Sequence, residues 1–331
     1  MFFTRSNIEK ARNEIQGAKS IVLTAHKSPD GDALGSALGM KKFLENLGKK
    51  VEVILPDEFP RNFAFLPGEL LIYDNDQGRA KQIISESDIV FCLDYNNLGR
   101  IGDMKEALQN YNGTKILIDH HTFPSDEFDL LFSAPQTGST CELVFEFIQD
   151  LDEYHCIDRD VATCLMTGLI TDTGSFRYGT NANTFKVASH LLKEGADIEE
   201  IQKKIFDNNS LDSLRLKGYA ILEKLELIGN GKIALLGLNE NELEQFNYQK
   251  GDTEGLVNKA LSIAGVEIAV FVSDRKGETR LSFRSKNAVK VNGIASEHFM
   301  GGGHEKAAGG RSDHNVADTI EKLKRILPEH V

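Results

Sequence analysis

Long apolar runs, paired cysteines and prolines are scarce in this chain of 331 residues. No apolar run approaches the ~20 residues that span a bilayer, and the amino-terminal segment MFFTRSNIEKARNE lacks the apolar core of a secretory signal, so we expect a cytoplasmic protein without a membrane partner. The four cysteines, Cys92, Cys141, Cys156 and Cys164, form no C-x-x-C pair and lie in apolar stretches, which predicts buried free thiols. With seven prolines and no low-complexity tract, the composition indicates a folded globular chain.

Positive charge is also in short supply. Lysine and arginine number 38 against 50 aspartates and glutamates, which leaves a formal net charge of −12. Proteins hold long polyanions in basic grooves by counterion release, so a long nucleic acid is not the expected ligand. A short anion, held locally or through a metal, stays compatible with this charge. At the usual ~150 residues per domain, the length predicts about two domains.

The first half of the chain alternates strand-length apolar runs with helical patterns. Residues Ser6–Glu9 predict a capping box that opens a short helix. The predicted strands cover 21–25, 51–55, 89–93 and 115–118, and helical patterns cover 37–47, 104–108 and 141–151, with Gly48 as a stop. This alternation predicts an α/β fold with a parallel sheet and helices on both of its faces.

The second half begins with helices and changes character near the segment 207–213. Before that segment, helical patterns cover 161–168 and 185–192, the latter ended by Gly195, and Asp197 with Glu200 caps a third helix. Beyond it we expect a helix to about 228, strands at 232–238, 267–273 and 279–285, a glycine-rich segment at 301–310 and a last helix near 320–326. This part is predicted to be a smaller, mixed α/β domain.

Charged residues follow the predicted strands directly. His26, Asp30 and Asp32 follow the first strand, Asp94 ends the FCLD run, and Asp119, His120 and His121 end the ILIDHH run. Open parallel sheets bind ligands at the carboxyl ends of their strands. Each aspartate alone is compatible with a turn or a helix cap, but capping does not account for the histidines beside them. The residues therefore predict one functional site at this edge.

Asp172 is a further candidate, because it lies eleven residues after Val161 and would return to the apolar face of a helix that continues so far. If Asp30, Asp32, Asp94 and Asp172 converge, their mutual repulsion requires cations, and two divalent ions would balance four carboxylates. Carboxylates with imidazoles suit Mn²⁺, and paired metals activate water and bind phosphoryl oxygens. Because G-x-S-x-G, Walker A and H-E-x-x-H motifs are absent, the pattern predicts metal-assisted hydrolysis of a phosphate ester.

The glycine-rich segment GGGHEKAAGG, 301–310, would let backbone amides approach an anion, with His304 as a polar contact. A tight turn between a strand and a helix explains the glycines equally well. Arg284 at the end of a predicted strand and Arg100 after Asp94 are candidate cations for an anionic ester.

Together these motifs resemble the DHH phosphoesterase superfamily. HKSPDGDALGS, FCLD, DHH and TDTGSF are similar to its four motifs, and RLSFRS with GGGHEKAAGG resembles the DHHA1 domain that follows. The resemblance spans nearly the whole chain and is greatest to the NrnA-type bifunctional oligoribonucleases and pAp phosphatases. One departure is that the family's usual four-glycine run is here Met300 followed by three glycines, which leaves the contact of the first glycine amide open.

The resemblance implies a role for each site residue. One metal would be held by His26, Asp30 and Asp94, and the other by Asp32, Asp94, His120 and Asp172, so that Asp94 bridges the two ions. Asp119 would orient a histidine, and His121 would contact the scissile phosphate. Arg284, Gly302, Gly303 and His304 would bind the far end of a short nucleotide across a cleft between the domains, with Arg100 as a further contact.

The implied protein is a two-domain enzyme with Mn²⁺, or alternatively Mg²⁺, as its cofactor. It would degrade very short RNA to mononucleotides and remove the 3′-phosphate of 3′-phosphoadenosine 5′-phosphate (pAp). The domain ranges are 1–206 for the DHH catalytic domain, 207–228 for a linker with a connecting helix and 229–331 for the DHHA1 domain. A homodimer is an open alternative to a monomer.

Other functions stay open at this point. Within the superfamily, the main alternative is a phosphodiesterase for cyclic or linear dinucleotides. An inorganic pyrophosphatase fits less well because that branch resembles only the first domain, and a RecJ-like exonuclease is disfavoured by the length and the acidic balance. Outside the superfamily, a nucleotide-sensing binding protein is an alternative, whereas a dinucleotide-binding oxidoreductase lacks its G-x-G-x-x-G motif after a strand.

Overall fold

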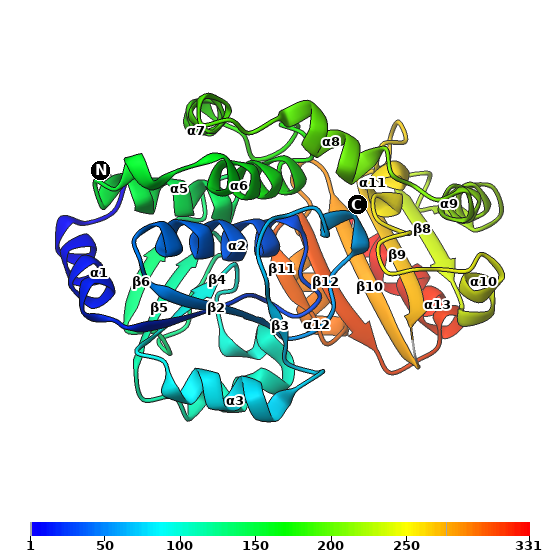
Figure 1. Cartoon of the computed structure of the whole chain (residues 1–331). Coiled ribbons are helices and arrows are strands. Elements are labelled where there is room, and N and C mark those ends of the chain that lie inside the picture. Colours follow the sequence, from blue (N-terminus) through cyan, green and yellow to red (C-terminus); the bar gives the residue numbers. More distant parts are fainter. Residues whose placement is uncertain (1, 276) are drawn as a thin grey trace. The chain divides into compact units, whose positions relative to one another are not determined.

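The computed structural model of the chain, which describes residues 2–275 and 277–331, divides into two compact units (Figure 1). The first unit extends to Asn208 and the second runs from Asn209 to Val331. Each unit contains its own six-stranded sheet. No helix among the described residues combines the length and the apolar character that a membrane crossing requires. The domain ranges given above stay a prediction.

The sheet of the first unit is wholly parallel, as predicted. Its strands are β1 (Ser20–Thr24), β2 (Lys50–Leu55), β3 (Leu71–Ile72), β4 (Ile89–Leu93), β5 (Thr114–Asp119) and β6 (Leu130–Ser133). They lie in the order β3-β2-β1-β4-β5-β6. The chain therefore builds outward in opposite directions from β1 and β4, and a sheet of this kind binds ligands where the order reverses.

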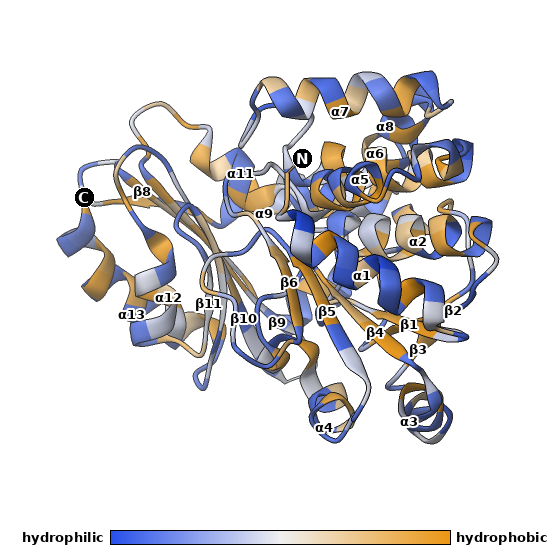
Figure 2. Ribbon diagram, turned by 90° about the vertical axis from the view of Figure 1, so that its left-hand side faces the viewer, coloured by the Kyte–Doolittle hydropathy of each residue, from blue (hydrophilic) through white to orange (hydrophobic). Residues whose placement is uncertain are grey.

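Helices cover both faces of this sheet, which confirms the second part of the prediction. They are α1 (Arg5–Gly17), α2 (Gly31–Asn46), α3 (Gln77–Glu86), α4 (Lys105–Gln109), α5 (Thr140–Asp150), α6 (Arg159–Asp172), α7 (Ala182–Lys193) and α8 (Ile198–Phe206), with short 3₁₀ helices η1 (Arg61–Phe63), η2 (Leu98–Met104) and η3 (Tyr154–Cys156). Alternate residues of β1 enter different cores: Ile21 and Leu23 pack with α2, α5 and α6, and Val22 packs with α3 and α4. In Figure 2 these two groups of helices lie on opposite sides of mostly apolar strands.

The sequence predicted three local features of the first unit: the start of α1, the end of α2 and the burial of the cysteines. The capping box at Ser6–Glu9 is wrong, because α1 begins earlier and its N-cap is Thr4, whose hydroxyl accepts from the Asn7 N–H. The glycine stop after α2 is confirmed by the left-handed Gly48, at φ 77°. Three cysteines are buried free thiols as expected, whereas Cys156 is only partly buried.

The sheet of the second unit is mixed, again as predicted. Its strands are β7 (Leu225–Ile228), β8 (Ile233–Leu238), β9 (Ile268–Arg275), β10 (Glu278–Ser285), β11 (Gly302–His304) and β12 (Ala307–Ser312), in the order β11-β12-β10-β9-β8-β7. Only β8 and β9 pair in parallel among these neighbours. The helices of the unit are α9 (Leu211–Glu223), α10 (Glu240–Gln245), α11 (Leu256–Leu261), α12 (Val291–His298), α13 (Val316–Ile326) and η4 (Leu327–His330).

Two predictions for the second unit are wrong in detail. The helix expected to reach 228 ends at Glu223, because Leu225–Ile228 turns back onto β8 through the left-handed residues Gly229, Asn230 and Gly231. The glycine-rich segment is not a strand-to-helix turn but the hairpin β11–β12.

Candidate metal and phosphate site

The first site residues lie where β1 passes into α2. His26 follows β1 by two residues and is buried. Asp30 is the N-cap of α2, and its carboxylate accepts from the Asp32 N–H at 3.0 Å and from the Ala33 N–H at 3.1 Å. Asp30 therefore has the capping role that its position allows, and it lies beside the histidine at the same time: its Oδ1 is 3.8 Å from His26 Nε2.

Asp94 is the central carboxylate of the site. It follows β4 directly, is 2% exposed and has a left-handed backbone with φ 62°. A left-handed conformation is uncommon outside glycine, and here the Asp94 N–H is bonded to the carbonyl of Ile118 in the next strand. The two oxygens of its carboxylate point to different histidines: Oδ2 is 3.3 Å from His26 Nε2, and Oδ1 is 3.6 Å from His120 Nε2.

Asp94 thereby joins two groups of ligand-type side chains. The donor atoms of His26, Asp30 and Asp94 lie within 4.8 Å of one another, and so do those of Asp32, His120 and Asp172. His120 Nε2 is 3.8 Å from Asp32 Oδ2 and 3.3 Å from Asp172 Oδ2. The six residues that the sequence proposed as metal ligands are thus brought together as two neighbouring groups.

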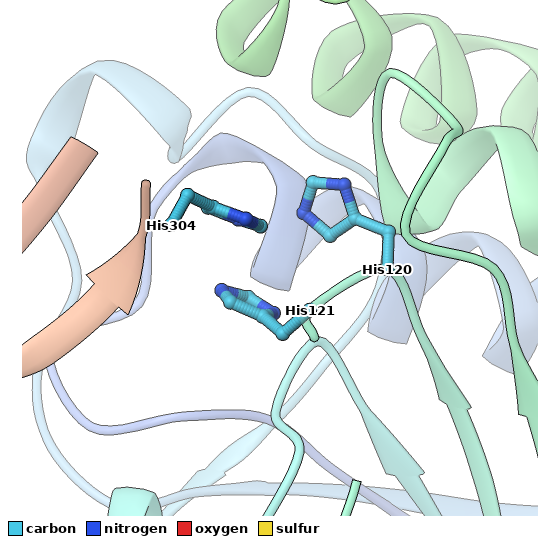
Figure 3. A group of neighbouring side chains, drawn as sticks. All are labelled: His120, His121 and His304. Atoms are coloured by element: carbon cyan, nitrogen blue, oxygen red, sulfur yellow. The ribbon is translucent and has the colours of Figure 1, made fainter. Parts of the chain in front are cut away.

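Asp119 and His121 form a separate pair beside these groups. The carboxylate of Asp119, which is fully buried, lies 2.7 Å from His121 Nδ1 and also accepts from the His121 backbone N–H at 3.0 Å. These two bonds fix the orientation of the imidazole. His120 and His121 are drawn on the loop after β5 in Figure 3, with their rings 5.0 Å apart and nearly perpendicular.

Close contacts between helices bring the carboxylates of α2 and α6 together. A Cβ on Gly35 of α2 would lie 2.5 Å from the Cys164 carbonyl of α6, and one on Gly168 of α6 would lie 2.2 Å from Cys141 Sγ of α5 and 2.7 Å from Asp32 Oδ1. Any larger residue at these two positions would force the helices apart. The glycines spaced by four in GDALGSALG were a signal for this packing that our sequence reasoning missed.

The end of α6 holds Asp172 in place. The helix does continue to Asp172, the condition on which the sequence argument for this residue depended, although Asp172 itself is exposed. Thr173 is the C-cap, and the three residues after it, Gly174, Ser175 and Phe176, are all left-handed, with φ between 57° and 64°. The Ser175 N–H bonds a carbonyl in the last turn of the helix at 2.8 Å, and the Thr173 hydroxyl accepts from the Phe176 N–H at 2.9 Å. These bonds close the helix end immediately after the site residue.

The electrostatics of the site indicate an excess of negative charge. Burial alone would lower the pKa of His120, but the carboxylates of Asp172, Asp32 and Asp94 outweigh burial and raise this pKa to about 9. Burial and the charge of Asp94 raise the pKa of Asp32 well above its usual range. Burial would also raise the pKa of Asp94, but His26, with His121 and His120, outweighs burial and lowers it. Asp32 therefore retains its proton unless a cation neutralises the cluster, which gives the site the character of a cation site.

The donor atoms suit a hard or borderline divalent ion. Both groups offer carboxylate oxygens and imidazole nitrogens, a set that fits Mn²⁺ and, less specifically, Mg²⁺. Cys141 is the nearby thiol, with Sγ 3.6 Å from the Asp32 carbonyl, and burial raises its pKa well above the usual range, so it is not a thiolate ligand. The residues present therefore fit a pair of such ions.

Arg100, in η2, lies beside the same site. Its carbonyl accepts from the Lys27 N–H at 2.8 Å, next to His26 in the chain. Burial lowers the pKa of His121, and the positive charge of Arg100 lowers it further against the effect of Asp119. Arg100 is partly buried, and its charge acts on His121, the histidine to which the family resemblance assigns the scissile phosphate.

In the second unit, two of the proposed substrate contacts share one face of the sheet. Arg284 of β10 and His304 of β11 are each paired with Ala307 of the intervening strand β12. Residues directly opposite one another in antiparallel strands point to the same face. Gly302 and Gly303 are exposed on β11, and a Cβ on Gly303 would lie 2.7 Å from the Ala307 carbonyl (β11 appears with His304 in Figure 3).

Met300 directly precedes the three glycines and stands where the resemblance implied a fourth glycine. Its backbone N–H donates to the Arg311 carbonyl at 3.1 Å, and the Arg311 N–H donates back to the Met300 carbonyl at 3.2 Å. The backbone amide of Met300 is therefore hydrogen-bonded to strand β12. This bond uses the backbone and does not require a glycine.

Thr140 is a site residue that sequence reasoning missed. It is the first residue of α5 and fully buried, and its hydroxyl donates to Asp94 Oδ1 at 2.9 Å. The backbone N–H groups of Thr140 and Cys141 donate to the two oxygens of Asp32 at 2.6 and 2.9 Å. The signal in the sequence was only Ser139 before an apolar helix, which indicates a cap and no more.

Comparison with known proteins identifies the family of the chain. A model of the DHH family, N-terminal domain, matches residues 20–169, and a model of the DHHA1 domain matches residues 230–329. A probable bifunctional oligoribonuclease and PAP phosphatase NrnA of Streptococcus mutans is 29% identical over 95% of this chain and 97% of its own length. The cyclic-di-AMP phosphodiesterase GdpP of Bacillus subtilis is 30% identical over 95% of this chain, which spans only 48% of that protein.

Solved structures of other proteins share the fold of this chain. The crystal structure of an exopolyphosphatase-related protein from Bacteroides fragilis superposes with a TM-score of 0.91, at 36% identity over 98% of both chains. RecJ of Thermus thermophilus, crystallised with Mn²⁺, shares the fold with a TM-score of 0.58 at 15% identity, over 99% of this chain and 55% of RecJ. By its two domain matches and its full-length structural relative, the chain belongs to the DHH/DHHA1 family of phosphoesterases.

Proposed function

We propose that the protein is a divalent-metal-dependent phosphoesterase that degrades very short RNA to mononucleotides and converts pAp to AMP. The observation that carries the proposal is the position of Asp94, whose two carboxylate oxygens face the histidines of two adjacent ligand groups. The relatives named as oligoribonuclease and PAP phosphatase, which align with this chain over nearly their whole length, support the substrate class.

His26, Asp30 and Asp94 would hold one ion, and Asp32, Asp94, His120 and Asp172 the other. Mn²⁺ is the ion we propose, with Mg²⁺ as the alternative, because the donor set suits Mn²⁺ better; the crystals of RecJ with either ion support a divalent metal in this fold. Two such ions supply charge stabilisation to the phosphoryl oxygens and lower the pKa of water at the site. The family resemblance and the shared carboxylate both favour two ions over one.

The remaining residues of the first unit would act on the ester directly. Asp119, bonded to His121 Nδ1, keeps the imidazole ring in one orientation, with Nε2 as the atom that contacts the scissile phosphate. Arg100 adds a positive charge beside this histidine, which favours an anionic ester.

The second unit would bind the far end of the substrate. Arg284 and His304, on one face of its sheet, are suited to a phosphate, and Gly302 and Gly303 leave their backbone open to close approach. A substrate held at two fixed points gains full affinity only when it reaches both. We therefore propose that oligonucleotides of a few residues are favoured over long strands.

Product analysis on end-labelled oligoribonucleotides of two to five nucleotides tests the proposal. A second measurement compares kcat/KM for a dinucleotide and a twenty-mer across a salt series at saturating Mn²⁺. With one or two phosphates contacted by side chains, the logarithmic salt slope should be about −1, since single strands give about −0.7 per phosphate. Mononucleotide products and a preference for the dinucleotide are expected. A preference for the twenty-mer with a steep slope would restore the exonuclease alternative.

A cyclic dinucleotide phosphodiesterase is the second candidate, favoured by the 30% identity to GdpP over 95% of this chain. Assaying cyclic and linear dinucleotides side by side separates the two functions, because the proposed enzyme should cleave the linear substrate faster. A protein that binds nucleotides without hydrolysis, the third alternative, would show no turnover with either. The cytoplasmic location and a homodimer stay predictions.

A further inference from the structure

The hydroxyl of Thr140 is in an unusual position for a threonine at the start of a helix. The capping role in α5 belongs to the preceding residue, Ser139, whose hydroxyl accepts from the Glu142 N–H at 3.0 Å. A threonine further along a helix commonly bonds a carbonyl of the preceding turn, but the first helical residue has no such turn behind it. The Thr140 hydroxyl instead donates to Asp94 Oδ1 at 2.9 Å.

We propose that Thr140 is a positioning residue that sets the orientation of the Asp94 carboxylate, so that one oxygen faces each ligand group. The inference rests on the two-metal site of the proposed function and deepens it. Without the hydroxyl, the carboxylate can rotate about its Cβ–Cγ bond, and Oδ1 is then not held near His120. A hydrogen bond from a buried neutral hydroxyl to a carboxylate restrains this rotation and leaves the remaining lone pairs for the ions.

The same helix end also holds the carboxylate of Asp32. Both of its oxygens accept backbone N–H groups from the first two residues of α5, and Thr140 supplies one of these groups as well as its hydroxyl. Asp32 and Asp94 belong to different ligand groups and to different elements, one in α2 and one after β4. Thr140 therefore contacts one carboxylate of each group. Its position sets the separation between the carboxylates of Asp32 and Asp94.

Replacing Thr140 by valine tests the proposal, because valine keeps the shape and removes only the hydroxyl. The measurement is the affinity of metal-free protein for Mn²⁺ by titration, with the electron paramagnetic resonance spectrum of the loaded site as a second readout. We expect Thr140→Val to weaken Mn²⁺ binding about 10- to 100-fold, the usual effect of losing a partner of a metal ligand, and to reduce the spectral signature of coupled ions. Thr140→Ser, which retains the hydroxyl, should recover most of the affinity.

Thr184 offers a matched control. It is fully buried on α7, and its hydroxyl donates to a carboxylate oxygen of Glu142 at 3.0 Å, but Glu142 belongs to none of the ligand groups. Thr184→Val loses this bond and also the bond that its hydroxyl accepts from the Asn181 N–H at 3.2 Å, so it should lower the melting temperature without changing the affinity for Mn²⁺.

The outcomes separate this inference from the proposed function. Wild-type affinity in folded Thr140→Val, or a loss in Thr140→Ser as large as that in Thr140→Val, would overturn the positioning role. A wild-type protein that binds two Mn²⁺ ions but cleaves no short RNA would overturn the proposed function alone. A wild-type protein that binds no Mn²⁺ would overturn both.

Discussion

The two units of the molecule place their functional residues in opposite ways. In the first unit three carboxylates of the site are buried: Asp32, Asp94 and Asp119 are at most 2% exposed and carry hydrogen bonds, whereas Asp30 and Asp172 are exposed. In the second unit, Gly302 and Gly303 are exposed on an edge hairpin. A mostly buried cluster whose central carboxylates are hydrogen-bonded suits ions that require fixed ligands, whereas an exposed edge suits a substrate that binds and dissociates.

The largest effect that follows from this difference concerns Asp94. Asp94→Ala removes the carboxylate that we propose to hold both ions, whose oxygens lie beside His26 and His120, so hydrolysis of every phosphate ester should fall about a thousandfold or more. The measurement is kcat/KM for a dinucleotide and for pAp, with circular dichroism to verify folding. Turnover close to the wild-type value in a folded variant would contradict the two-metal mechanism.

Close packing in the first unit is the next feature to test. In Gly168→Ala the new methyl group would lie 2.2 Å from Cys141 Sγ and 2.7 Å from Asp32 Oδ1, and the resulting strain should lower the free energy of unfolding by about 1–3 kcal/mol. Urea denaturation measures this change, and weaker Mn²⁺ binding should accompany it.

Gly218 in α9 provides the control for that glycine. A Cβ there has no neighbour within 4 Å, so Gly218→Ala should stabilise the protein by about 0.4–1 kcal/mol. If Gly218→Ala lowers the free energy of unfolding as much as Gly168→Ala does, the contact with Asp32 is not the cause of the destabilisation.

His304 tests whether the second unit binds rather than catalyses. His304→Ala should raise KM for a dinucleotide about tenfold and change kcat little, because a contact made equally in the ground and transition states affects binding alone. His330→Ala, at an exposed histidine near the carboxyl terminus, should alter neither constant. A loss confined to kcat would place His304 in the chemical step. The second unit would then take part in catalysis and not in binding alone.

The smallest predicted effect concerns Asp88, a carboxylate outside the site whose role is structural. The backbone N–H groups of Ser20 and Lys19 lower the pKa of Asp88, which is exposed. A lowered pKa stabilises the fold above the ordinary carboxyl pKa of about 3.9, and this contribution is lost as the pH falls through the folded value. Asp88→Asn should therefore lower the melting temperature by no more than about 2 °C at pH 7, and the two proteins should converge below about pH 4. A gap that persists at low pH would contradict this account.

Strands and helices with strong apolar patterns were predictable from the sequence. The runs at 89–93 and 51–55 became β4 and β2 because each is long and apolar enough to be buried on both faces. β3 was missed because Leu71–Ile72 is too short to form a pattern, and the helix end near 228 was wrong because the pairing of β7 with β8 depends on a remote strand. Local periodicity contains no information about such partners.

The same limit applies to the candidate site. The aspartates and histidines were identifiable because capping explains an aspartate after a strand but not the histidines beside it, and because the motifs resemble those of a known family. Thr140 and Gly168 were not, because a threonine at a helix start and a glycine within a helix are ordinary in sequence. Their importance comes from contacts with Asp32 and Asp94, which are 108 and 46 positions away from Thr140.

The left-handed segment after α6 has a consequence for local stability. Helix ends usually open first in hydrogen-exchange experiments, because their last carbonyls and the amides beyond them have no partner. Here the amides of Ser175, Phe176 and Tyr178 are all bonded back to the end of the helix or to Thr173. Asp172 therefore belongs to a segment that resists fraying, and its carboxylate can keep its place beside His120 through the local openings that would disperse an ordinary helix end.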